Sequence, residues 1–273
     1  MLIKDIITQK PHTIPQETTL INASDYMALE KIRNLPVVDK DNKLTGLITL
    51  REIIDAWARD ARKTSVQEAM IKHITTVESS FPLKGAIEMM VASKYSCLPV
   101  TEADKTLVGF VTESDLLKHL VAQVELKHDI KCVREIMNGN PPHLNENESL
   151  GNASLFMKQN RIRNLPVIDK DKKLVGLLTL REIINVLSLT GDIDNVTIKS
   201  GMLKQMTTIE AGTLLKSAIE NMFTNHYGCL PVIDNKNKKL IGNVSEYDLL
   251  KTLYSMLKVP QDFFAERLGK YFT

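Results

Sequence analysis

The sequence repeats itself, and this self-similarity limits the possible folds more than any other feature. Residues 31–56 read KIRNLPVVDKDNKLTGLITLREIIDA, and residues 161–186 read RIRNLPVIDKDKKLVGLLTLREIINV; the two segments are identical at 19 of 26 positions without a gap. Residues 95–118 and 227–251, YSCLPVTEADKTLVGFVTESDLLK and YGCLPVIDNKNKKLIGNVSEYDLLK, form a second related pair. The chain therefore consists of four units, named A, B, A′ and B′ in chain order, and each contains a Leu-Pro-Val run.

Every unit has the same pattern of apolar and polar residues. In unit B an extended lead-in, ITTVESS, precedes LKGAIEMMVASKY, whose apolar residues recur at helical spacing. In unit A the run LPVV, the polar turn DKDNKL and the run TGLIT predict a hairpin of two strands, and LREIIDAW begins a second helix. We expect the helices to cover one face of the hairpin. Because a unit this small has a limited core, A should pack face to face on B, and A′ on B′.

Composition and charge argue against several classes of protein. Lys and Arg total 35 and Asp and Glu total 33, without a basic block, so no nucleic-acid partner is expected. No run approaches ~18 uncharged apolar residues, so no membrane-spanning segment is expected. The three cysteines form neither a metal pair nor a disulfide framework, which favours a reducing, cytoplasmic location. The six histidines form no metal-binding motif, and we find no catalytic motif.

The LPVVD strand, the polar turn and the glycine-led strand that ends in Ser/Thr-x-x-Asp resemble the cystathionine-β-synthase-type domain, or CBS domain. The resemblance extends to about Val259. It implies an α+β (α/β) fold of four CBS repeats (strand-helix-strand-strand-helix), packed as two pseudo-twofold pairs called Bateman modules. The repeats are expected at 1–60, 61–125, 126–190 and 191–259, with modules at 1–125 and 126–259 and a C-terminal helical extension at 260–273.

The resemblance also implies a function. In this family the clefts between paired domains commonly bind AMP, ADP, ATP or S-adenosylmethionine, and a chain with four repeats looks like the regulatory subunit of AMP-activated protein kinase. We therefore expect a non-catalytic sensor, without a catalytic cofactor, that transmits a conformational change to a second copy or to an effector protein. The repeats fill almost the whole chain, which leaves no room for a catalytic domain. The alternative is a structural interaction module with vacant clefts.

The turn between the second strand and the second helix carries the predicted ligand chemistry. The first N–H groups of a helix have no intrahelical partner, and the helix dipole favours an anion there. A hydroxyl at this turn can donate to a phosphate, and a carboxylate three residues later can accept from ribose hydroxyls. The same spacing also forms a capping box, which is the interpretation that Glu favours in A (Thr49–Glu52) and A′ (Thr179–Glu182). The candidate ligand residues are Thr112, Ser114 and Asp115 in B, and Ser245, Tyr247 and Asp248 in B′.

By the same resemblance, the base of the ligand lies against the paired unit, near its lead-in and the residues before Leu-Pro. The guanidinium groups of Arg33 and Arg163 suit phosphate recognition, and salt bridging between modules is an equal alternative. Cys97 and Cys229 are expected mainly to pack in the core. The resemblance assigns His12, Ile32 and Arg33 to the Asp115 site, Pro142, Ile162 and Arg163 to the Asp248 site, and Ser96, Cys97 and Cys229 as the corresponding small residues of B and B′.

Overall fold

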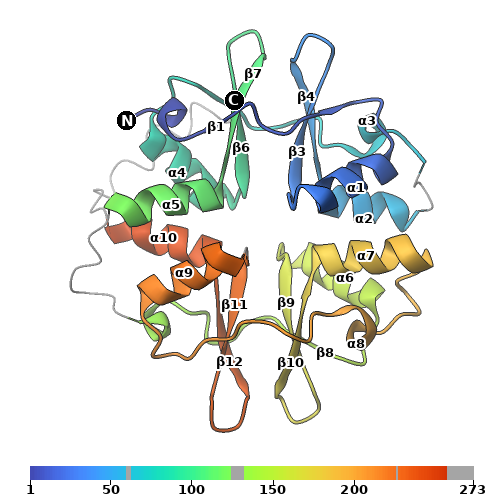
Figure 1. The fold of residues 1–273 in the computed structure, drawn as a ribbon, viewed down its shortest axis with the longest axis vertical. Coiled ribbons are helices and arrows are strands. Elements are labelled where there is room, and N and C mark those ends of the chain that lie inside the picture. Colours follow the sequence, from blue (N-terminus) through green and yellow to red (C-terminus); the bar gives the residue numbers. More distant parts are fainter. Residues whose placement is uncertain (60–62, 124–131, 226, 257–273) are drawn as a thin grey trace.

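The computed structural model describes residues 1–59, 63–123, 132–225 and 227–256. Viewed along the shortest axis of the molecule, the four units occupy four quadrants, with A and B in one half and A′ and B′ in the other (Figure 1). The helix expected at 260–273 lies outside the described residues. In the part of the chain that is described, no helix is long and apolar enough to cross a membrane.

The predicted order of a helix, two hairpin strands and a second helix is confirmed in all four units. Unit A contains the 3₁₀ helix η1 (Ile3–Asp5), β1 (Thr8–Gln9), β2 (Ile14–Pro15), α1 (Leu20–Leu29), β3 (Asn34–Val38), β4 (Leu44–Thr49) and α2 (Leu50–Trp57). Unit B contains α3 (Val66–Ala69), β5 (Val77–Glu78), α4 (Leu83–Ser93), β6 (Cys97–Thr101), β7 (Leu107–Thr112) and α5 (Glu113–Gln123). Unit A′ contains η2 (Val133–Glu135), β8 (Leu144–Asn145), α6 (Leu150–Gln159), β9 (Asn164–Ile168), β10 (Leu174–Thr179) and α7 (Leu180–Thr190). Unit B′ contains α8 (Ile198–Gly201), α9 (Leu215–Asn225), β11 (Cys229–Ile233), β12 (Leu240–Ser245) and α10 (Glu246–Met256).

Each unit is built on an antiparallel hairpin, which is β3–β4, β6–β7, β9–β10 or β11–β12. The lead-in strands β2, β5 and β8 pair in parallel with β3, β6 and β9. Strand β1 crosses from unit A to pair with β7 of unit B. The first residues of the chain therefore tie the two units of the first module together.

The largest apolar clusters join units of opposite modules. In the cluster shared by B and B′, α5 packs on α10, and Leu116, Leu120 and Leu253 are each at most 1% exposed. In the cluster shared by A and A′, α2 packs on α7, with Ile53 and Ile183 fully buried (Figure 1). The two modules are therefore held together mainly by apolar helix faces.

The sheets of A and B also meet, over a smaller cluster. Leu47, Cys97 and Phe110 form this cluster, and Ile74 packs against it. Two backbone hydrogen bonds of 3.0 Å also join the hairpin turns of A and B. Packing of A on B is therefore present, but the sequence pattern did not predict that more apolar residues are buried between the modules than between the sheets.

One polar pair is buried inside the B–B′ cluster. The hydroxyl of Tyr254 on α10 donates to Oε1 of Glu88 on α4 at 2.5 Å, and the two residues are 6% and 7% exposed. Burial and the adjacent Glu88 raise the pKa of the Tyr254 hydroxyl, which therefore keeps its proton and donates. Because a carboxylate in apolar surroundings needs such a donor, Glu88 of the first module depends on the second module.

Removing this hydrogen bond tests the contact between the modules. Tyr254→Phe leaves the buried Glu88 without its donor, so we expect the free energy of unfolding to fall by about 1–3 kcal/mol. Tyr254→Phe combined with Glu88→Leu should recover most of the loss, because both polar groups are then removed. Urea denaturation measures both effects. An unchanged midpoint for Tyr254→Phe would contradict the contact.

Candidate functional site

The four strand-to-helix turns gather at the centre of the molecule. The inner ends of the four hairpins point toward this centre, and the hairpin turns point outward (Figure 1). Helices α2, α5, α7 and α10 each begin where the second hairpin strand ends. The packing of the helices between the modules therefore brings together the turns that the sequence singled out.

In units B and B′ the turn carboxylate caps its own helix with one oxygen. Oδ2 of Asp115 accepts from the backbone N–H and the hydroxyl of Thr112 at 2.9 and 2.7 Å. Oδ2 of Asp248 accepts from the backbone N–H and the hydroxyl of Ser245 at 2.9 and 2.5 Å. No described residue donates to Oδ1 of either aspartate, and both side chains are half-buried. Each turn thus has one carboxylate oxygen that a ligand hydroxyl can use.

In units A and A′ the equivalent residue is a glutamate. The hydroxyl of Thr49 donates to Oε2 of Glu52, and the hydroxyl of Thr179 donates to Oε2 of Glu182. Each threonine oxygen also accepts a helix N–H at 3.2 Å. Burial raises the pKa of Glu52 and of Glu182, and the threonine hydrogen bond partly opposes the shift. Thr49 and Thr179 thus cap their helices as predicted, but each glutamate accepts from the threonine hydroxyl and not from the backbone N–H that a capping box requires. The reciprocal capping box forms instead in B and B′.

The two arginines that precede Asn-Leu-Pro reach across the centre to the opposite module. Nη2 of Arg33 in A donates to Glu246 of B′ at 3.1 Å, and Nη2 of Arg163 in A′ donates to Glu113 of B at 2.7 Å. The glutamate side chains are 7% and 4% exposed, whereas the arginines are 36% and 31% exposed. Burial raises the pKa of Glu113; the charge of Arg163 opposes this shift and Glu246 reinforces it. Of the two interpretations left open for the arginines, the structure contains the salt bridges between modules.

The arginines are bonded to turns other than those that the sequence assigned to them. We grouped Arg33 with Asp115 and Arg163 with Asp248, but each guanidinium is bonded to the turn that carries the other aspartate. The physical reason is the stacking of the modules, which places A diagonally from B′. Gly228 permits this approach, because a Cβ atom there would lie 2.6 Å from Nη1 of Arg33.

The middle residues of the B and B′ turns have different partners. Ser114 belongs to the central cluster, since its hydroxyl donates to Oε1 of Glu246 at 3.0 Å. Tyr247 occupies the same position in B′, but its hydroxyl donates to the carbonyl of Val91 at 3.2 Å. The ammonium of Lys94 lies 5.8 Å from the centre of the Tyr247 ring. The two aspartate turns are therefore not equivalent.

Two of the residues assigned to the base are bonded within the protein. His12 is exposed, and its Nδ1 lies 2.6 Å from the hydroxyl of Tyr26 in the same unit. The carbonyl of Ile162 accepts from Nη2 of Arg51 at 2.8 Å, which is a further contact between A′ and A. The structure thus uses Ile162 in the contact between modules.

The remaining candidates lie in or beside the strands. Ile32 and Pro142 are half-buried, and the carbonyl of Ser96 accepts the first N–H of α5 at 3.1 Å. Cys97 and Cys229 are buried, and burial raises the pKa of both thiols to about 12, so they stay protonated and pack as expected. Among the described residues, no group of His, Cys, Asp or Glu suits a metal ion.

Glu113 and Glu246 were missed by the sequence analysis. They are the second residues of the B and B′ turns, TESD and SEYD, and Leu50 and Leu180 occupy this position in A and A′. A buried glutamate where related units have leucine needs a charged partner. The difference between the units was therefore the signal that pointed to a partner, although it did not identify the arginines.

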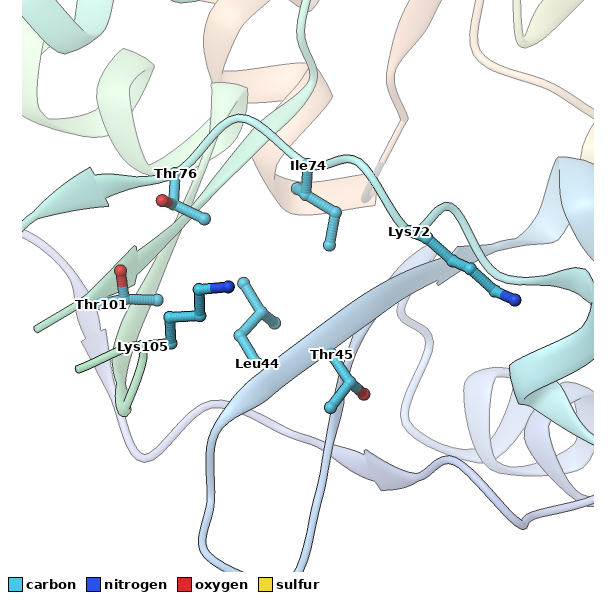
Figure 2. Close-up of a pocket in the computed structure, with 7 residues that line it drawn as sticks. All are labelled: Leu44, Thr45, Lys72, Ile74, Thr76, Thr101 and Lys105. Atoms are coloured by element: carbon cyan, nitrogen blue, oxygen red, sulfur yellow. The ribbon is translucent and has the colours of Figure 1, made fainter. Parts of the chain in front are cut away.

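A small pocket lies at the outer end of the first module, away from these turns. It measures about 130 Å³ and is lined by residues of β4, of the lead-in of unit B and of the β6–β7 hairpin (Figure 2). Leu44, which lines it, begins β4, and Thr49 of the turn ends that strand, so about 16 Å of strand separates the two places. The lining residues are Leu44, Thr45, Lys72, Ile74, Thr76, Thr101 and Lys105.

The four units and the centre at which their turns meet have the architecture of a CBS-domain protein. The model of the CBS domain matches residues 3–59, 66–122, 133–189 and 193–255, so the chain belongs to the CBS-domain family. The match covers the four units that the repeats defined. CBS pairs of this kind are regulatory modules.

Two similar proteins match this chain over most of its length. Protein MJ1225 from Methanocaldococcus jannaschii is 27% identical over 269 residues, which cover 88% of this chain and 94% of that protein. Its crystal structure, described as that of a proposed archaeal homologue of γ-AMPK, has a TM-score of 0.84 at 26% identity and covers 92% of this chain and 99% of that one. A conserved protein from Pyrococcus horikoshii shares the fold, with a TM-score of 0.63 at 22% identity over 93% of this chain and 100% of that one.

The diagonal salt bridges should contribute to stability. Arg163→Met leaves buried Glu113 without its partner, and we expect the free energy of unfolding to fall by about 1–3 kcal/mol, less than for a fully buried pair because the arginine is partly exposed. Arg163→Met with Glu113→Met should lose less than the single variant does. A urea-denaturation cycle measures the coupling, and exposed Arg161→Met is the control with no expected effect. Additive losses would contradict the pairing.

The glutamate caps predict a pH dependence. A carboxyl group whose pKa is raised on folding adds stability below its unfolded pKa, and this contribution disappears as the pH rises through the folded pKa. Glu52 and Glu182 should therefore lower stability as the pH rises above about 4.5. Glu52→Gln with Glu182→Gln keeps an oxygen for each cap and removes the charge. Melting curves from pH 4.5 to neutrality should show a gain of the double variant over wild type that grows with pH; a constant difference would contradict the assignment.

Proposed function

We propose that the chain is a non-catalytic sensor that binds an adenosine-containing ligand, namely AMP, ADP, ATP or S-adenosylmethionine, in the clefts between paired CBS domains. The observation that carries this proposal is the geometry of the two aspartate turns. Asp115 and Asp248 each cap a helix with Oδ2, and no described residue donates to Oδ1. A ribose offers two adjacent hydroxyl donors, which match a carboxylate held in this way.

The charges around the turns support the same ligand class. The positive ends of the helix dipoles at the starts of α5 and α10 favour a phosphate or another anionic group. Arg33 and Arg163 are about one-third exposed, so a ligand phosphate can reach either guanidinium. To bind there, the phosphate must exchange with Glu246 or Glu113 as the partner of the arginine. The bidentate geometry of the guanidinium group suits both partners.

This exchange supplies a route for the signal. A ligand that takes Arg33 from Glu246 weakens a bond between the two modules, and it favours the arrangement in which the ligand binds best. The change in module orientation would then be read by an effector protein or a second copy of the chain. We propose a non-catalytic role because CBS domains match most of the chain and because the chain is similar to MJ1225.

Substitution of the two aspartates tests the proposed ligand sites. At about 100 times its dissociation constant, a ligand at one site should raise the melting temperature by roughly 5–10 °C. Asp115→Asn with Asp248→Asn keeps an oxygen for each helix cap but removes the charge and one acceptor, so most of this rise should disappear. Thermal shift with each of the four ligands, followed by calorimetric titration, measures the response and counts the sites.

The glutamate turns provide the matched control. Glu52→Gln with Glu182→Gln changes the same position of the other two turns, and the ligand response should remain. If the Glu pair abolished binding and the Asp pair did not, the ribose sites would be assigned to the wrong turns. If the wild-type protein responded to none of the four ligands, the chain would be the structural interaction module with vacant clefts.

A further inference from the structure

The pocket at the outer end of the first module is lined by a threonine whose hydroxyl has no hydrogen-bond partner among the described residues. Thr101 ends β6, is 5% exposed and lines the pocket (Figure 2). No described residue forms a hydrogen bond with its hydroxyl. This oxygen is not among the fully buried side-chain atoms that lack a partner, so it is accessible from the pocket and can donate to a ligand there.

The other three units show that the fold does not need this hydroxyl. Val38, Ile168 and Ile233 occupy the position of Thr101 in A, A′ and B′. An apolar β-branched residue therefore fits the end of this strand, as expected for a buried strand position. Unit B alone has threonine there.

The charged groups that line the pocket are positive. The lining includes Lys72 and Lys105 and contains no carboxylate, and neither lysine forms a salt bridge with a described residue. The ammonium of Lys72 is directed away from the pocket, so Lys105 supplies the charge inside it (Figure 2). The ammonium of Lys105 points into the space bounded by Thr76, Ile74 and Leu44 (Figure 2). Ammonium and hydroxyl groups are hydrogen-bond donors, so the pocket matches an anionic acceptor.

The size of the pocket limits the ligand. Its volume of about 130 Å³ is well below the ~300–1,000 Å³ of pockets that hold drug-sized molecules, and it is close to the ~150 Å³ of a cavity that holds benzene. A tetrahedral oxyanion fits this volume, and a nucleotide does not. The pocket also lies a strand length from the turn of unit A, so it is separate from the proposed adenosine sites.

We propose that this pocket binds a small inorganic oxyanion, phosphate or sulfate. The hydroxyl of Thr101 and the ammonium of Lys105 are its main donors, and Thr76 and Lys72 lie at its rim. Because Leu44 and Thr45 belong to unit A and the donors belong to unit B, the bound anion links the two hairpins of the first module. This site is independent of the adenosine sites and goes beyond the proposed function.

Titration of the full chain with sodium phosphate, against sodium chloride at equal ionic strength, tests the site. At about 100 times the dissociation constant, phosphate should raise the melting temperature by roughly 5 °C or more beyond chloride and shift the backbone amide signals of Thr101 and Lys105 in NMR spectra. Thr101→Val should leave the melting temperature without phosphate unchanged or higher, yet lose most of the phosphate-dependent rise. Lys105→Gln should lose it as well.

Lys238→Gln is the matched control. Lys238 lies two residues before β12, as Lys105 lies before β7, and both have positive φ, but the second module has Ile233 in place of Thr101. This variant should keep the phosphate response. Equal responses of wild type and Thr101→Val, loss of the response in Lys238→Gln, or no response of the wild type beyond chloride would each overturn the proposal. A sulfate titration identifies the anion: a response to either oxyanion that Thr101→Val removes supports the site.

Discussion

The packing of α5 on α10 and of α2 on α7 is the contact on which the rest of the structure depends. It buries the apolar helix faces of both modules and brings four strand-to-helix turns to one centre. Only in this arrangement do Arg33 and Arg163 meet Glu246 and Glu113. The buried carboxylates would be costly without the arginines, so apolar burial and charge pairing favour the same stacking of the modules.

The features that could be predicted from the sequence are local. The units, their hairpins and their helices follow from apolar runs and polar turns that lie within about 30 residues of one another. The threonine caps at Thr49 and Thr179 follow from the Thr-x-x-Glu pattern, and the structure has both caps without the full capping box. The buried, unreactive state of Cys97 and Cys229 follows from their place in apolar strands. For the hairpins, helices and caps, the residues that make the contact lie in one unit.

The features that could not be predicted join distant parts of the chain. Arg33 and Glu246 are 213 residues apart, and Tyr254 and Glu88 are 166 residues apart. The residue pattern of one unit does not indicate which other unit it contacts. The turns of B and B′ are so similar that either is a plausible partner for Arg33. The stacking of whole modules determines which turn each arginine contacts. For the same reason, the sequence grouped Arg33 with Asp115 and Arg163 with Asp248 and did not reveal their salt bridges to Glu246 and Glu113.

The contacts between the modules join like with like, A with A′ and B with B′, as in the isologous interface of a twofold dimer. In a homodimer of an A–B chain, every substitution would appear on both sides of that interface. A single chain is free of this restriction. Tyr254 on α10 bonds to buried Glu88, whereas α5 has Val121 at the equivalent position, and Glu220, the counterpart of Glu88, is exposed. Duplication within one chain thus lets each unit change independently, so helices and turns with a common origin have acquired different partners.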